Sequence, residues 1–145
     1  ERAERDATTH TGEIDLYFFA RGLRSYYNMG YRFRDEDANL ERLDFTSHAA
    51  KLRYIRRVDI GRKVLKVEMA YRYEKRDYSG VTPCIGSIEG EPRKDERHRV
   101  QIDLEYPVTK QGALQLYLAY GDYQSNFPIS DFDQGIVGSR YVYRW

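Results

Sequence analysis

The alternation of apolar and polar residues constrains the fold of this chain more than any other feature. In the last stretch, residues 131–145, the side chains of Tyr141, Tyr143 and Trp145 lie on one side of an extended chain, and Arg140 lies on the other. A period of two residues is typical of a β-strand, whose successive side chains point to opposite faces. Aromatic rings at a chain end gain little from exposure to water, so we expect an apolar environment to cover them.

The same period recurs along the rest of the chain and predicts an all-β protein. Residues 1–12 are polar and lack an apolar period, so we expect a loop or the exposed end of a strand there. Strands with one apolar side and one charged side are predicted at residues 13–20, 24–35, 45–58, 62–76, 100–106, 114–120 and 131–145.

The connections between these strands alternate in length. Tight turns at one end and long loops at the other are typical of antiparallel up-and-down barrels that span the bacterial outer membrane. The sequence therefore predicts a transmembrane β-barrel of about seven strands, in one domain covering residues 1–145, with membrane lipid as a partner. Short turns are predicted near residues 22, 60 and 110, and longer loops at residues 35–42, 77–98 and 124–130.

Composition fits such a barrel and argues against several other classes of protein. Charged residues make up 32% of the chain, and it has no run of about 18 apolar residues that would cross a membrane as a helix. Barrel strands hide their apolar residues in alternation, so a mean hydropathy of -0.80 does not argue against them. A net charge of +1 gives no reason to expect nucleic acid as a partner. The single cysteine, Cys84, predicts neither an intrachain disulfide nor a metal site, and we expect no cofactor.

The number of strands leaves the predicted barrel incomplete. Seven strands place the start of the first one on the outer side, whereas bacterial single-chain barrels usually have an even number of strands. Three explanations stay open: residues 1–12 form an irregular eighth strand, upstream strands are absent from this chain, or another chain closes the barrel. Because the chain starts at Glu1 without an initiator methionine or a signal sequence, we expect upstream strands.

A soluble β-sandwich or lipocalin-like barrel also has alternating strands, so alternation alone does not exclude one. The apolar sides here are rich in tyrosine and supply few compact Val, Leu and Ile residues for a packed interior. Tyrosines also concentrate toward the ends of the predicted strands, as in the aromatic girdles of membrane barrels, and we therefore favour the membrane barrel. The predicted girdle residues are Tyr31, Tyr71, Tyr73, Tyr120, Tyr141 and Tyr143.

The terminal hairpin resembles that of a known class of membrane barrels. Residues 125–133, SNFPISDFD, and the final Trp145 are similar to the last hairpin of Gram-negative outer-membrane barrels of the porin type and of surface-lipoprotein assembly modifier barrels. Residues 31–38, YRFRDEDA, resemble an outer loop of the same families. The final aromatic residue also resembles the signal that the barrel assembly machinery recognises, although Phe is commoner there than Trp. The resemblance implies a location in the bacterial outer membrane.

The charged sides of the strands carry the candidate functional residues, because a barrel would turn them toward its lumen. Like charges on neighbouring strands are destabilising unless solvent, acidic partners or an anion screens them. A turn centred on Asp59 and Ile60 would pair Lys51 with Glu68. It would also pair Arg53 with Lys66, so a basic stripe would remain, and in a water-filled lumen such a stripe favours anions. The predicted lumen-lining residues are Arg24, Arg32, Arg34, Lys51, Arg53, Lys66, Glu68, Arg72, Asp103, Glu105 and Arg140.

Two functions fit these residues. The first is a transport protein, a pore that gives an aqueous path with a basic wall. The second is a non-conducting structural or assembly barrel that binds partners through its outer loops. The purely structural interpretation of the same charges is a salt-bridged plug that fills a small barrel, with Glu13 and Asp15 opposing the basic stripe, because such a barrel has room only for side chains.

We expect no enzymatic activity. Ser47 and His48 are neighbours in a predicted strand, so they point to opposite faces and do not form a nucleophile and base. We interpret His10, His48 and His98 as non-catalytic residues that lie in loops or at the membrane interface.

Overall fold

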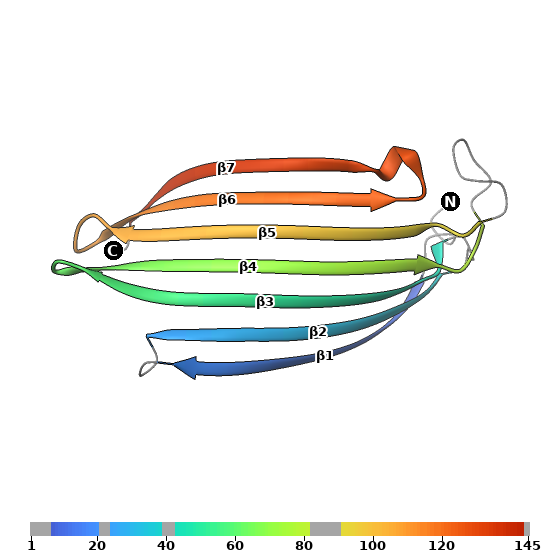
Figure 1. The fold of residues 1–145 in the computed structure, drawn as a ribbon, viewed down its shortest axis with the longest axis horizontal. Helices are drawn as coiled ribbons and strands as arrows, with labels where there is room; N and C mark the ends of the chain where they lie inside the picture. The colour runs from blue at the N-terminus through green and yellow to red at the C-terminus, as the bar shows by residue number, and fades with distance from the viewer. Residues whose placement is uncertain (1–6, 21–23, 39–42, 82–90, 144–145) are drawn as a thin grey trace.

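We describe residues 7–20, 24–38, 43–81 and 91–143 of the chain in a computed structural model (Figure 1). These residues form seven long β-strands and include a short 3-10 turn before the last strand. The elements are β1 (Ala7–Ala20), β2 (Ser25–Ala38), β3 (Phe45–Ile60), β4 (Lys63–Tyr78), β5 (Lys94–Pro107), β6 (Gly112–Ser125), η3 (Pro128–Ser130) and β7 (Phe132–Tyr143).

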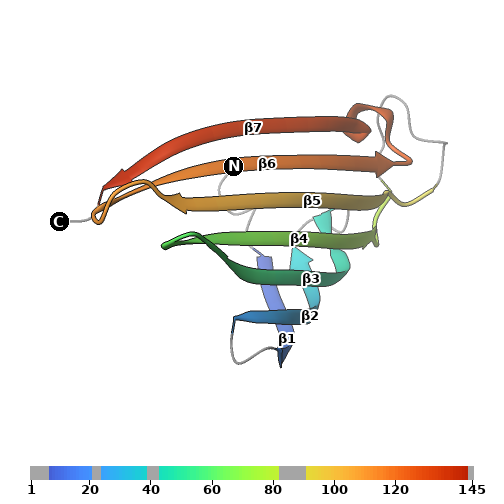
Figure 2. The ribbon, with the colours of Figure 1, turned by 60° about the vertical axis from the view of Figure 1, so that its left-hand side comes forward.

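All seven strands belong to one antiparallel sheet, in the order in which they follow along the chain. This confirms the predicted all-β, up-and-down arrangement. The sheet is twisted and curved, with β1 at one edge and β7 at the other (Figures 1 and 2). Within the described residues β1 and β7 do not pair with each other, so the sheet is open and the predicted closed barrel is not formed by these strands alone.

The hairpin between β3 and β4 turns later than predicted. Ile60 pairs with Lys63, so Gly61 and Arg62 form a two-residue turn. Gly61 has a φ of 62°, a backbone conformation that glycine adopts at little steric cost. The prediction centred the turn on Asp59 and Ile60, and it therefore did not place Gly61 at the turn position that requires a positive φ.

The later turn changes every cross-strand partner in this hairpin. Moving the centre of a turn by two residues moves each partner by four, an even number that leaves every side chain on its predicted face. The predicted pairing of Lys51 with Glu68 is wrong, because Lys51 lies opposite Arg72. Arg53 lies opposite Ala70, so its predicted pairing with another cation is wrong too.

Several strands continue beyond the apolar stretches that predicted them. Residues 7–12 form the first half of β1 and pair with β2, so they are the exposed end of a strand and not a separate eighth one. Residues 35–38, predicted as part of a loop, belong to β2, and β5 begins at Lys94, inside the predicted loop 77–98. Backbone pairing extends here through polar segments, which an apolar period does not detect.

The two faces of the sheet differ in chemistry, as the alternation predicted. We call the apolar face the outer face and the charged face the inner face. Neighbouring strands place apolar side chains in line with one another across the outer face. One row consists of Leu16, Met29, Leu52, Tyr71, Val100 and Tyr120, and the next of Phe18, Tyr27, Tyr54, Met69, Ile102, Leu118 and Val137.

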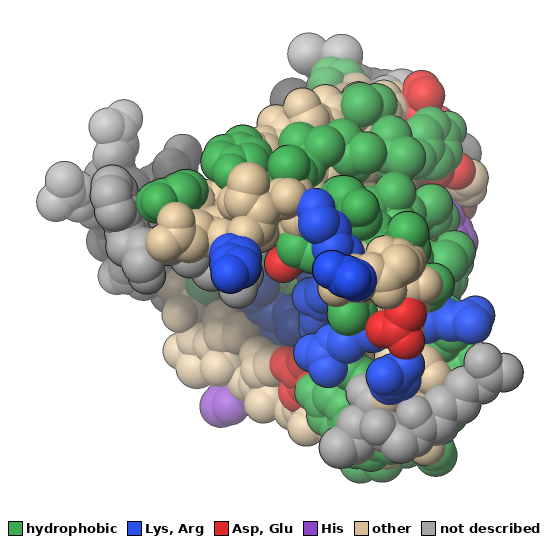
Figure 3. Space-filling model, turned by 90° about the vertical axis from the view of Figure 1, so that its left-hand side faces the viewer, with side chains coloured by type: hydrophobic (Ala, Val, Ile, Leu, Met, Phe, Trp, Pro, Cys, Tyr) green, Lys and Arg blue, Asp and Glu red, His purple; other side chains and the backbone are tan. Residues whose placement is uncertain are grey.

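No other part of the described chain covers the outer face. The chain exposes 10662 Å² of surface, whereas a compact folded monomer of its mass exposes roughly 7800 Å². Leu116 and Leu118 are 43% and 44% exposed. Viewed along the strands, lysine and arginine side chains gather in the hollow of the curve, with hydrophobic side chains around it (Figure 3). The buried hydrophobic residues among those described are Ala38, Phe45, Ala49 and Ile55.

Candidate functional site

The inner face gathers the charged residues that the sequence singled out. Residues directly opposite in an antiparallel pair share a face, and so do residues two apart on one strand. Arg24 precedes β2 and forms an ion pair with Asp59 near the end of β3. The other predicted residues lie within strands and share the inner face: Arg32, Arg34, Lys51, Arg53, Lys66, Glu68, Arg72, Asp103, Glu105 and Arg140.

Ion pairs connect β1 to β3 across β2. Glu13 Oε2 lies 3.1 Å from Arg32 Nε, and Glu13 Oε1 lies 3.2 Å from Lys51 Nζ. Lys51 Nζ also lies 2.9 Å from Asp15 Oδ1. Gly30 stands between Lys51 and Asp15, and a Cβ there would lie 2.3 Å from Lys51 Cε and 2.4 Å from Asp15 Oδ1. The missing side chain at Gly30 therefore leaves the space through which Lys51 reaches β1.

Two glutamates of β4 neutralise other cations of the inner face. Glu68 Oε1 lies 2.6 Å from Arg53 Nε, an ion pair without the geometry of a hydrogen bond, and Oε2 lies 3.3 Å from Lys66 Nζ. Glu74 Oε1 accepts a hydrogen bond of 2.7 Å from Arg76 Nε. Most cations of the predicted basic stripe on β2 and β3 thus have carboxylate partners.

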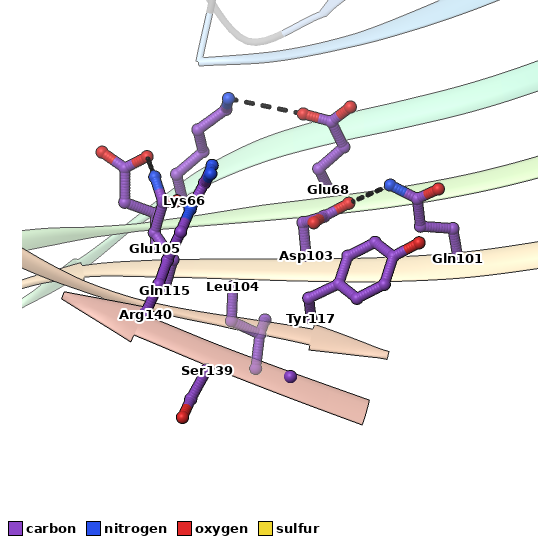
Figure 4. Close-up of a pocket in the computed structure, with 11 residues that line it drawn as sticks. Lys66, Glu68, Gln101, Asp103, Leu104, Glu105, Gln115, Tyr117, Ser139 and Arg140 are labelled. Carbon is purple, nitrogen blue, oxygen red and sulfur yellow. Dashed lines mark hydrogen bonds and ion pairs between the residues drawn. The ribbon is translucent and has the colours of Figure 1, made fainter. Parts of the chain in front are cut away.

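A hollow of about 570 Å³ lies on the inner face between β4 and β7 (Figure 4). Glu68 and Asp103 lie directly opposite each other on its wall. Glu105 accepts a hydrogen bond of 2.6 Å from Gln115 Nε2, and the Oε1 atom of Gln115 accepts one of 2.5 Å from Arg140 Nε. The lining of the hollow is therefore mixed in charge, and the basic part of the inner face lies elsewhere.

Two arginines of β5 belong to the inner face although the prediction did not include them. Arg97 lies opposite Glu74, and Arg99 lies opposite Arg72. The prediction assigned Arg97 to a long loop and started the strand just after Arg99. Extending the alternation of β5 by two steps toward its start would have placed both arginines on the charged side.

The histidines of β3 and β5 lie on the outer face among tyrosines. His48 Nδ1 lies 2.6 Å from Tyr31 Oη, and His98 Nδ1 lies 2.8 Å from Tyr71 Oη. Ser47 points to the inner face, so it lies on the opposite side from His48, as the alternation predicted. The tyrosines predicted as girdles all lie on the outer face: Tyr31, Tyr71, Tyr73, Tyr120, Tyr141 and Tyr143.

An ion pair with a buried carboxylate joins three strands at the end of the sheet that carries the longer connections. Arg93 donates hydrogen bonds of 2.8 and 2.7 Å to the two carboxylate oxygens of Asp95, and Ser125 Oγ donates one of 2.7 Å. The Arg93 guanidinium also lies 5.1 Å from the ring centre of Tyr78 and 5.8 Å from that of Phe127. The hydrogen bonds to Asp95 raise the pKa of Arg93, so this guanidinium stays charged.

Comparisons with models of protein families, with curated proteins and with solved structures find no match. The resemblance of the terminal hairpin to porin-type barrels thus stays a prediction, and Trp145, on which part of it rests, lies outside the described residues.

The described residues contain neither a membrane-crossing helix nor a metal site. None of their helices is long and apolar enough to cross a membrane. No group of three or more His, Cys, Asp and Glu side chains among them is placed to hold a metal ion, and Cys84 lies outside the residues described.

Proposed function

We propose that this chain forms part of the wall of a bacterial outer-membrane β-barrel and provides an aqueous path that favours anions. One observation carries the proposal: a single curved antiparallel sheet has an exposed apolar outer face and a charged inner face. Soluble proteins bury the apolar face of a sheet against a second layer. The described residues supply no second layer, so the proposal assigns membrane lipid to the outer face.

The direction of the edge strands defines what would close the barrel. β1 and β7 are parallel to each other, because alternate strands of an antiparallel sheet run the same way. Closure through antiparallel pairs therefore needs an odd number of further strands between β7 and β1, which gives the even total common in bacterial barrels. A second copy in the same membrane orientation would meet β7 with a parallel strand. We therefore propose that strands outside residues 7–143, or a different chain, complete the wall, and that the barrel assembly machinery inserts it.

Reconstitution of the full chain in planar bilayers tests this function. We expect stepwise conductance, with a reversal potential in a salt gradient that indicates a preference for anions. Arg53→Glu should lower that preference, because it removes a cation and places a second carboxylate beside Glu68. Arg32→Glu should act in the same direction beside Glu13.

Lys110→Glu is the matched control, because it makes the same change of charge in the exposed turn between β5 and β6. It should change the preference for anions less than the two inner-face variants do. A folded, inserted protein without conductance steps would contradict the proposed path.

A second candidate is a non-conducting structural or assembly barrel. The ion pairs of Glu13 with Arg32, and of Glu68 with Arg53, favour it because they cross-link the wall and lower its net charge. In a closed barrel of few strands such pairs would fill the lumen. The same bilayer recordings distinguish the candidates, since a silent but inserted barrel would favour the second.

A further inference from the structure

Three cations lie side by side across the inner face, near the middle of their strands. Lys51 on β3 lies directly opposite Arg72 on β4, which lies directly opposite Arg99 on β5. Directly opposite residues have Cβ atoms about 4.5–5.5 Å apart, and like charges at such positions are destabilising. The side chains of Lys51 and Arg72 are 36% and 47% exposed, and Arg99 is exposed too. This cationic row is therefore open to solvent from the inner face.

The nearby carboxylates neutralise the charges of the three cations in this row to different extents. The acidic residues of β1 that pair with Lys51 lie on the side away from Arg72. Arg72 Nη2 lies 3.7 Å from Glu74 Oε2, and Glu74 already accepts a 2.7 Å hydrogen bond from another arginine. No carboxylate of the described residues pairs with Arg99, whose Nη2 donates a hydrogen bond of 2.7 Å to Tyr117 Oη. Arg99 is thus the cation of the row that the nearby carboxylates compensate least.

We propose that Arg72 and Arg99 bind a phosphate-class oxyanion, with Lys51 as the neighbouring cation of the row. A guanidinium presents N–H donors in a planar fork that matches the oxygens of phosphate, and lysine adds a compact positive charge. A multivalent anion between the arginines would screen the repulsion that the register imposes. This site rests on the proposed function, because its ligand reaches the inner face through the lumen, and it names the solute class that the path would favour.

Inorganic phosphate is the probe for a direct binding measurement. The full chain, folded in detergent micelles, is titrated with phosphate by calorimetry at constant ionic strength, since salt screens exposed charges. We expect saturable binding that is roughly tenfold weaker or more in Arg72→Gln and in Arg99→Gln, because each loses a charge-assisted hydrogen-bond donor. Arg57→Gln is the control: it removes an exposed cation from the same face of β3, six residues from Lys51, and should leave the affinity almost unchanged.

Thermal unfolding separates loss of the ligand from a folding defect. In chloride, Arg99→Gln should raise the unfolding midpoint relative to the wild type, because it removes a like charge from the row. In phosphate at the same ionic strength, this advantage should shrink or reverse, because only the wild type gains stability from the full site. An equal response of both proteins to phosphate, or binding that survives Arg72→Gln and Arg99→Gln together, would overturn the site.

Conductance recorded on the same preparations distinguishes failure of the phosphate site from failure of the proposed aqueous path. A silent protein that binds phosphate through Arg72 and Arg99 would overturn the path and keep the site. A conducting protein that does not bind phosphate would overturn the site and keep the path.

Discussion

At the scale of single residues, the most informative position on the inner face is one without a side chain. Gly30 lies between Asp15 and Lys51, and the ion pair of those residues occupies the space that a Cβ would take. A glycine inside a strand costs about 0.5–1 kcal/mol relative to alanine. Its presence here is explained by the close approach of two neighbouring side chains, and not by an unusual backbone angle.

Replacing Gly30 with alanine tests that explanation. Gly138→Ala is the control on the same face of β7, where nothing lies within 4 Å of the new Cβ. We expect Gly138→Ala to raise the free energy of unfolding by about 0.5–1 kcal/mol, whereas Gly30→Ala should give no gain or a loss because it displaces Lys51 from Asp15. Urea titration of both variants measures the difference. Equal stabilisation by the two substitutions would contradict the role assigned to Gly30.

At the scale of strands, one carboxylate holds the ends of several elements together. Asp95 is 3% exposed and accepts hydrogen bonds from Arg93 and from Ser125 at the end of β6. Arg93 in turn packs on the ring of Tyr78 at the end of β4. These polar and cation–π contacts fix the start of β5 between its two neighbours.

Asp95→Asn should therefore destabilise the sheet. The substitution keeps the shape of the side chain but removes the charge that Arg93 and Ser125 both contact, and a buried group that loses its partner costs about 1–3 kcal/mol. Asp131→Asn makes the same change at an exposed residue just before β7 and should have little effect. Chemical denaturation of the two variants gives the comparison, and a loss of stability shared equally by both would argue against this role of Asp95.

The arrangement of the strands explains why the face of a residue could be predicted from the sequence and its cross-strand partner could not. A period of two is a local property, so it assigned Arg32, Lys51 and Glu68 to one face correctly. Cross-strand partners depend on the position of a turn, and the turn was centred two residues too early because the positive φ of Gly61 leaves no trace in the apolar pattern. Arg99 was missed for a related reason, since charged residues continue β5 beyond its apolar stretch.

At the scale of the whole molecule, no element of the described residues covers the apolar outer face or pairs with the outer edges of β1 and β7. One row of apolar side chains runs across all seven strands and the next across six, and no layer of the described residues covers them. In water such a surface would drive association, whereas in a bilayer it would face hydrocarbon. If lipid covers the outer face, a charged substitution there should cost more stability than one on the inner face.

Two adjacent residues of β6 allow a charge on the outer face to be compared with a charge on the inner face at nearly the same position along the strand. Leu118 lies on the outer face and is 44% exposed, and its neighbour Ala119 lies on the inner face. If lipid covers the outer face, Leu118→Arg should destabilise the protein in lipid vesicles by about 2–4 kcal/mol, the cost of arginine near the bilayer midplane, while Ala119→Arg should cost much less. Urea unfolding in vesicles measures both values. Similar costs for the two substitutions, or a larger cost for Ala119→Arg, would mean that the outer face does not contact lipid, and the proposed path would lose its physical basis.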